Sequence, residues 1–334
     1  MNTAMSAERT GPPELLRMER VSVSYRTTDG PLPAVRDVDL VVRSGEVVGV
    51  AGESGCGKST LASTVLRLQP KDAKVDGRVL VGGRDVLTMR WGDLRTVRWA
   101  EASIVFQGAL HSLNPVKRVG DQIAEPIRLH EPSLSDADVE ERVAELLEQV
   151  GLPRYRSRAY PHQLSGGQKQ RVMIAMALSC RPDLVIADEP TTALDVMVQA
   201  QILGLLSGLV REMGVGMLII SHDLSLLADV CDRVAVMYAG RIVETGTADQ
   251  VFNRPLHPYA AALSAAFPKI GDPAARYAPA GLAGDPPDPR DLPSGCAFAP
   301  RCSLAIEQCT AAEPELATHE ADRSAACIRV GVAS

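Results

Sequence analysis

One segment of the chain has residue types and spacing that could hold a chain of phosphates. It comprises eight consecutive residues, Gly52, Glu53, Ser54, Gly55, Cys56, Gly57, Lys58 and Ser59. An apolar run precedes the segment and an apolar-periodic stretch follows it, which predicts a strand, a loop and a helix in that order. The glycines allow backbone N–H groups to point inward at an anion, and the helix adds the positive end of its dipole. The pattern therefore predicts a site for a nucleoside triphosphate.

Side chains at the end of this segment predict how the triphosphate is held. The Lys58 ammonium can reach the β- and γ-phosphates, and the Ser59 hydroxyl is placed to ligate Mg²⁺. We include the next residue, Thr60, in the predicted set of ATP contacts.

Polar residues at the ends of two further apolar runs predict hydrolysis. Asp188 and Glu189 follow the run Leu184–Ala187, and His222 follows the run Met217–Ser221. Asp188 is expected to hold Mg²⁺ through water, and Glu189 to act as general base for the attacking water. His222 can donate a hydrogen bond to the γ-phosphate. Since parallel strands present their carboxyl ends at one edge of a sheet, these side chains should lie beside the phosphate loop.

A second motif precedes Asp188 and indicates the class of nucleotide-binding protein. It consists of Leu164, Ser165, Gly166, Gly167 and Gln168. Together with the phosphate loop and the Asp-Glu pair, it resembles the ATP-binding-cassette (ABC) ATPases, whose signature is LSGGQ. The resemblance covers about residues 16–255.

The resemblance implies further site residues. Tyr25 matches the aromatic residue that stacks on adenine, and Gln107 matches the Q-loop glutamine, which contacts Mg²⁺ and the attacking water. Asp195 belongs to the D-loop, and His222 matches the switch histidine. The signature motif of such proteins completes the ATP site of an opposite subunit, so one copy of this chain cannot close a site and is expected to hydrolyse ATP poorly without a second cassette.

The predicted fold is α/β, a P-loop NTPase of the ABC type with a RecA-like core, an antiparallel β part and a helical subdomain. Apolar runs that alternate with helices predict a mostly parallel sheet covered by helices. The predicted strands are Val21–Tyr25, Val35–Val42, Val47–Ala51, Leu184–Ala187, Met217–Ser221 and Val234–Tyr238, and the predicted helices include Val196–Met213. A second helix is expected to start after Ser135 with a capping box and to end before Gly151.

We expect three parts along the chain. Residues 1–15 form a flexible tail, and residues 16–255 form the nucleotide-binding domain, with its helical subdomain at about 89–180. Residues 256–334 form an extension of the type found in peptide importers. Six prolines and four glycines between Gly271 and Gly295 predict an irregular linker within this extension.

Residues flanking the motifs resemble the ATP-binding subunits of the peptide and nickel importers, most closely the D-type subunit of dipeptide and oligopeptide permeases. They include Ser112-Leu113-Asn114-Pro115, Tyr160-Pro161-His162-Gln163 and Arg254-Pro255-Leu256-His257-Pro258-Tyr259. This resemblance implies ATP hydrolysis that drives import of di- or oligopeptides, with nickel as the alternative cargo. A soluble ABC ATPase and a regulatory protein that binds ATP without hydrolysing it are the remaining alternatives.

The partners implied are a second ABC subunit, expected to be an F-type paralogue that makes a heterodimer, two membrane permease subunits and, indirectly, a substrate-binding protein. A formal net charge of −6 and the lack of a long basic run argue against nucleic acid. No stretch approaches the roughly 18 apolar residues of a membrane helix. The chain is therefore expected to be peripheral, at the cytoplasmic face of a prokaryotic plasma membrane.

Four of the seven cysteines, Cys296, Cys302, Cys309 and Cys327, lie near the C-terminus. Clustered thiols in a cytosolic chain suggest a metal site. Their spacing resembles the tail of the D-type subunits, which implies a [4Fe–4S] cluster. From the residues alone, zinc, a disulfide or no metal remain alternatives. We expect the ATP site to be built entirely from the cassette, without this tail.

Overall fold

The computed structural model describes residues 12–106, 108, 112–191, 195–266, 282 and 284–330. The helices are α1 (Lys58–Val65), α2 (Trp91–Val97), α4 (Val119–His130), α5 (Asp136–Gln149), α6 (Gly166–Leu178), α7 (Val196–Met213), α8 (Leu224–Val230), α9 (Ala248–Asn253) and α10 (Pro258–Ala266). The strands are β1 (Glu14–Thr27), β2 (Gly30–Arg43), β3 (Val47–Ala51), β4 (Lys74–Val81), β5 (Arg84–Asp85), β6 (Ala102–Val105), β7 (Leu184–Asp188), β8 (Gly216–Ser221), β9 (Arg233–Tyr238), β10 (Arg241–Thr247), β11 (Ala317–Glu320) and β12 (Arg323–Ala325).

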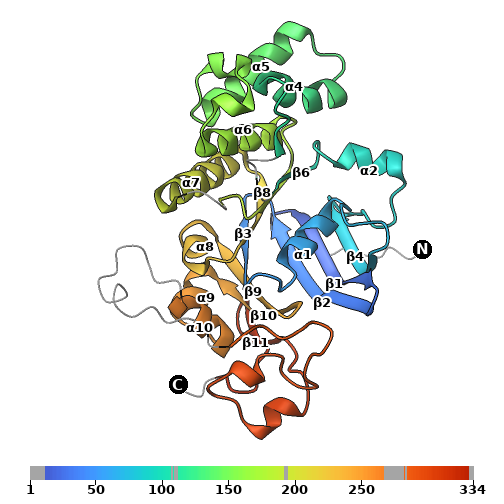
Figure 1. The fold of residues 1–334 in the computed structure, drawn as a ribbon, viewed down its shortest axis with the longest axis vertical. Helices are drawn as coiled ribbons and strands as arrows, with labels where there is room; N and C mark the ends of the chain where they lie inside the picture. Colours follow the sequence, from blue (N-terminus) through green and yellow to red (C-terminus); the bar gives the residue numbers. More distant parts are fainter. Residues whose placement is uncertain are drawn as a thin grey trace, which may run out of the picture.

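Two sheets form the centre of the molecule (Figure 1). Among the described residues, eight strands form the larger sheet in the order β11-β12-β10-β9-β3-β8-β7-β6, and β9, β3, β8, β7 and β6 run parallel. The smaller sheet is antiparallel, in the order β2-β1-β4-β5. The predicted combination of a parallel core with an antiparallel β part is confirmed.

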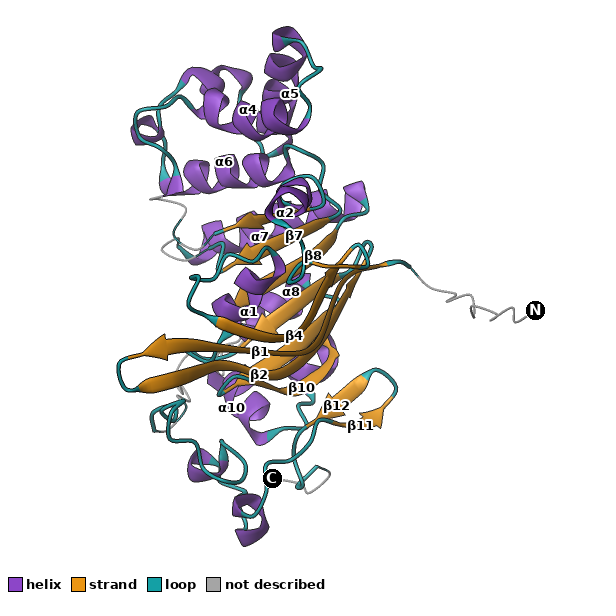
Figure 2. Cartoon of the chain, turned by 90° about the vertical axis from the view of Figure 1, so that its right-hand side faces the viewer, coloured by secondary structure: helices purple, strands orange, loops and turns teal. Residues whose placement is uncertain are grey.

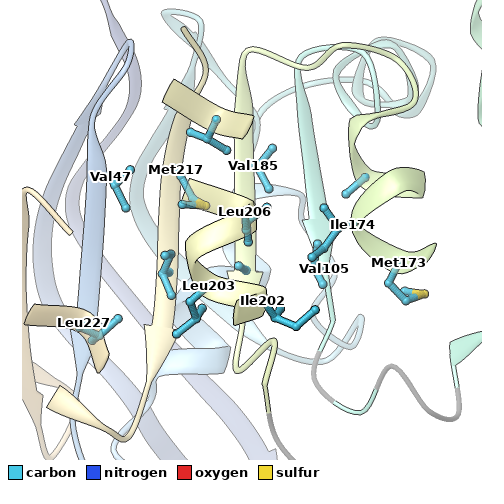
Figure 3. Packing of buried hydrophobic residues seen from close by; sticks show 14 of the residues in the cluster. Val47, Val105, Met173, Ile174, Val185, Ile202, Leu203, Leu206, Met217 and Leu227 are labelled. Atoms are coloured by element: carbon cyan, nitrogen blue, oxygen red, sulfur yellow. The ribbon is translucent and has the colours of Figure 1, made fainter. Parts of the chain in front are cut away.

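The parallel strands are mostly apolar, as expected for a sheet that is covered on both faces. One face carries Val47, Val105, Val185 and Met217, which pack against α6, α7 and α8 (Figure 3). The alternate residues of the same strands, such as Val48 and Ile186, pack with Leu61 of α1 and with the antiparallel sheet. Alternate side chains of β3 therefore pack into two hydrophobic cores, which fix the strand from both sides. The phosphate loop begins at the end of this strand.

The structure lengthens two predicted strands. β1 and β2 contain 14 residues each and pair as a hairpin. β2 includes Pro31 and Pro33, which the apolar pattern excluded from a strand. It tolerates them because β2 is an edge strand of its sheet.

The region from about residue 89 to 180, which the sequence predicts to be helical, also contains a strand. β6 lies within it and pairs with β7 in the core sheet, so the chain leaves the sheet only after Val105. The helices α4, α5 and α6 then gather at one end of the molecule (Figure 1). The predicted start of α5 is confirmed, because Ser135 and Asp138 form a reciprocal capping box.

The C-terminal residues extend the core sheet. β12 pairs with β10, and the β11–β12 hairpin lies at the sheet edge (Figure 2). Glu244 of β10 is fully buried, and its carboxylate accepts hydrogen bonds from the N–H groups of Leu256 and His257 and pairs with Arg323 of β12. These contacts satisfy a buried charge, which would otherwise be costly. Within the described ranges, no helix combines the length and the apolar character needed to cross a membrane.

Candidate functional site

The phosphate loop connects the centre of the core sheet to α1. Gly52 and Gly57 have φ angles of 157° and 106°. A Cβ at Gly52 would lie 2.3 Å from the carbonyl oxygen of Met237, and a Cβ at Gly57 would lie 2.1 Å from that of Ala34. Both positions therefore require glycine, because the loop runs tightly against the backbone of two neighbouring segments.

The N-terminal end of α1 faces this loop. Gly57 is the N-cap residue and provides no side-chain hydrogen bond, so N–H groups of the first turn remain available to an anion. Lys58 is only 4% exposed, and its ammonium donates to the carbonyl oxygens of Gly52 (2.8 Å) and Glu53 (2.9 Å). The buried positive charge therefore lies inside the curve of the loop, where it would attract the phosphates of a bound nucleotide.

A hydroxyl and a carboxylate meet beside the loop. The Ser59 hydroxyl donates to Asp188 at the end of β7, with 2.9 Å between the oxygens. Burial raises the pKa of Asp188, and the hydrogen bond from Ser59 opposes that shift. Hydroxyl and carboxylate oxygens are the ligands that Mg²⁺ takes in phosphate-loop proteins, so this pair fits the ion.

Glu189 and His222 lie at the same edge of the sheet, after β7 and β8. The His222 Nδ1 lies 3.6 Å from a carboxylate oxygen of Glu189, which raises the pKa of the imidazole. Glu189 has a φ of 42°, in the left-handed region that non-glycine residues rarely adopt, and its N–H donates to the carbonyl of Ile220. Strained backbone of this kind is concentrated at functional sites, where surrounding contacts hold it.

Tyr25 also reaches the loop, from β1. Its hydroxyl lies 3.1 Å from the hydroxyl of Thr60 in the first turn of α1. The two sheets therefore contribute side chains to one site. Gln107, which we predicted to be the Q-loop glutamine of this site, lies outside the described residues.

The signature segment, by contrast, makes its contacts within itself. Ser165 is the N-cap of α6, and Ser165 and Gln168 form a capping box. In the part of the chain that the structure describes, no hydrogen bond or ion pair joins Leu164–Gln168 to the phosphate loop. Asp195 caps α7 in a similar way through the N–H of Val198. The N-terminal end of α6 is therefore available to a group outside this chain.

Three of the four C-terminal cysteines, Cys296, Cys302 and Cys309, lie in short turns before β11, and Cys327 follows β12. The Cys296 N–H donates to the carbonyl of Cys309, and the Arg329 N–H donates to the sulfur of Cys327. Burial raises the pKa of the Cys296, Cys302 and Cys327 thiols. All seven cysteines are free, so the disulfide alternative is wrong.

The predicted metal site is not formed by the side chains as they stand. Among the described residues, no group of three or more His, Cys, Asp or Glu side chains is arranged to hold a metal ion.

The structure also reveals contacts to the phosphate loop that the sequence did not predict. Arg301, one residue before Cys302, makes a bidentate ion pair with Glu53, at 2.7 and 2.9 Å. The hydroxyl of Tyr259 in α10 accepts a hydrogen bond from the Glu53 N–H at 2.9 Å. The expectation that the site is built from the cassette alone is therefore wrong. No local pattern could reveal these contacts, since 248 residues separate Glu53 from Arg301.

Comparison with known proteins agrees with this geometry. A family model described as ABC transporter matches residues 35–192, and one described as oligopeptide/dipeptide transporter, C-terminal region, matches residues 243–309. The oligopeptide transport ATP-binding protein OppD of Salmonella typhimurium is 44% identical over 317 residues, which cover 94% of this chain and 93% of OppD. The chain belongs to the ABC transporter family. The OppD of Escherichia coli is 44% identical over 302 residues, covering 90% of this chain and 89% of that protein.

Solved structures of ABC cassettes share the fold. The dimeric ABC transporter cassette MJ0796 has a TM-score of 0.63 and 27% identity, and covers 70% of this chain and 98% of its own. A post-hydrolysis state of the same cassette, bound to ADP and phosphate, matches equally well. The cbiO1 protein of Clostridium perfringens has a TM-score of 0.62. The chain is an ABC ATPase, and membership of the family implies that it binds ATP and Mg²⁺.

Proposed function

We propose that this ABC ATPase energises the import of di- or oligopeptides. The observation that carries the proposal is that the similarity extends beyond the cassette into a C-terminal region described for oligopeptide and dipeptide transporters. Deletion of the gene should abolish uptake of a labelled oligopeptide, and a plasmid copy should restore it. Unchanged peptide uptake together with lost nickel uptake would instead favour the nickel alternative.

We assign the following roles within the site. The loop Gly52–Ser59 and Thr60 hold the phosphates, with Lys58 as their main cation, and Tyr25 stacks on adenine. Ser59, Asp188 and Gln107 hold Mg²⁺, which when bound neutralises charge that develops on the phosphates. Glu189 accepts a proton from the attacking water. His222, which Glu189 holds and whose pKa it raises, donates to the γ-phosphate.

The roles of the signature segment and of Asp195 concern assembly. We propose that Leu164, Ser165, Gly166, Gly167 and Gln168 complete the ATP site of a second cassette, with Asp195 in the D-loop at that interface. Support comes from the N-terminal end of α6, where Ser165 is exposed and where no hydrogen bond or ion pair to the phosphate loop is found among the described residues. Closure of two cassettes on ATP would then move two membrane permease subunits from their cytoplasmic side.

If two cassettes complete each ATP site, the isolated subunit should have a low ATPase activity. One chain carries half of each site, so its ATPase rate should be low alone and should rise when an F-type paralogue and the permease subunits are added. Steady-state phosphate release measures this. The replacement of Ser165 by Arg should remove the increase and leave nucleotide binding to the isolated chain unchanged. Full activity of a complex that holds only two copies of this chain would contradict the heterodimer.

We further propose that the four cysteines hold a [4Fe–4S] cluster within the extension at residues 256–334, with zinc as the alternative. Clustered thiols and a backbone N–H that donates to a sulfur, as Arg329 does to Cys327, are typical of iron–sulfur sites, where such hydrogen bonds tune the cluster. The region has few large apolar side chains, so a metal centre would stabilise it.

The cluster predicts a visible colour. Protein prepared without oxygen should be brown, with a broad absorption near roughly 400 nm and about four irons per chain. Replacement of Cys327 by Ser should bleach this absorption, whereas the replacement of Cys180, which lies in the cassette, should not. One tightly held zinc in colourless protein would assign the site to zinc. Colourless protein without metal would contradict both forms of the proposal.

A further inference from the structure

Glu53 is held at three points within the phosphate loop. Its carbonyl accepts from the Lys58 ammonium, its N–H donates to the hydroxyl of Tyr259, and its carboxylate pairs with Arg301. Only the first of these partners belongs to the loop itself. The other two come from residues that follow the cassette in the sequence, so the conformation of the loop depends on them.

The ion pair between Arg301 and Glu53 is largely shielded from solvent. The Arg301 side chain is 6% exposed and that of Glu53 is 23% exposed, so solvent screens the pair poorly. The geometry is bidentate, which fixes orientation as well as charge. In addition, Arg301 Nη1 lies 3.3 Å from the Tyr238 hydroxyl at the end of β9. Removal of Arg301 would leave a carboxylate without its cation in a loop that must accept a polyanion.

Rigid packing holds Arg301 in position. Phe298, which is 3% exposed, contacts the rings of Tyr238 and Tyr259 with 5.3 Å between the centroids in each case. The rings of Tyr238 and Tyr259 themselves lie 4.5 Å apart. Glu313 adds a second attachment, since it pairs with Arg36 of β2 and Arg241 of β10. The turn that carries Arg301 is therefore fixed on the cassette by aromatic and ionic contacts.

We propose that Arg301 is a positioning residue of the ATP site, through which the C-terminal segment sets the affinity of the phosphate loop for ATP. The pair neutralises the Glu53 carboxylate and holds Glu53 so that its carbonyl and the Lys58 ammonium stay in register. The inference rests on the binding of ATP by this loop. It does not depend on the cargo or on a metal at the cysteines.

Titration of the full-length chain with ATP and Mg²⁺ by calorimetry tests the proposal. The titration of the wild-type chain first tests whether the chain binds ATP, on which the proposal rests. Replacement of Arg301 by Ala should weaken the affinity about tenfold, the size expected when a charged hydrogen-bonding partner is lost. Replacement by Lys should restore part of the loss. The matched control is Arg254→Ala, because the Arg254 side chain is exposed and its one ion pair among the described residues, with Asp249, is long at 4.0 Å.

The double variant Arg301→Ala with Glu53→Ala separates positioning from folding. If the unpaired Glu53 carboxylate weakens binding, the double variant should bind ATP at least about threefold more tightly than Arg301→Ala. Higher salt should also bring the ATP affinity of Arg301→Ala closer to that of the wild type. A role in folding alone predicts that the double variant binds as weakly as the single one. That result, or a wild-type affinity in Arg301→Ala, would overturn the proposal. Failure of the wild-type chain to bind ATP would instead overturn the proposed function.

Discussion

Replacement of Glu189 by Gln should leave ATP binding intact and reduce the turnover rate of the assembled transporter by about 10² to 10⁴-fold, the contribution of a general base. The amide has nearly the same size as the carboxylate but cannot accept the proton of the attacking water. Lys58, Ser59 and Asp188, which hold the phosphates and Mg²⁺ in our assignment, remain unchanged. The variant should therefore accumulate as a closed pair of cassettes loaded with ATP.

Two measurements check this result. Steady-state phosphate release gives the turnover rate, and size-exclusion chromatography with bound nucleotide reports the closed pair. Glu212→Gln is the matched control, since Glu212 is exposed on α7, remote from the carboxyl ends of the sheet strands. A turnover rate near that of the wild type in the Glu189 variant would remove Glu189 from the role of general base.

Replacement of Lys58 by Ala should act on binding instead of turnover. The ammonium is buried inside the loop and donates to two of its carbonyl groups. Its loss removes the main cation for the β- and γ-phosphates and also loosens the loop. We expect the dissociation constant for ATP to rise about 10- to 100-fold, which corresponds to the loss of one charged hydrogen-bonding partner.

Calorimetric titration with ATP measures the effect, and Lys71→Ala, at an exposed position, is the control. A thermal unfolding curve of the Lys58 variant distinguishes lost binding from a lost fold. Equal affinities of the Lys58 and Lys71 variants would contradict the assignment of Lys58. The contrast between the Glu189 and Lys58 variants is itself informative, because only the second should fail to bind nucleotide.

Local patterns predicted much of the fold correctly. The bounds of β3 and α7 agree with the predicted ones, since each element is a continuous apolar or apolar-periodic run between clear turn or capping residues. The capping box at Ser135 was also predicted correctly, because it depends on two residues only three positions apart. β6 was missed because a four-residue strand within a largely helical region has no distinctive period. The length of the β1–β2 hairpin was missed because its prolines and polar residues hide an edge strand.

By itself, the sequence determined the family, the phosphate loop and the polar residues that follow β7 and β8. These depend on residue types at short spacing, which local chemistry dictates. Only the tertiary structure decided which distant side chains meet. The contacts of Tyr25 with Thr60, of Tyr259 with Glu53 and of Arg301 with Glu53 all join separate elements. They arise because the sheets and the C-terminal segment pack around one loop, and no short pattern encodes a contact across 248 residues.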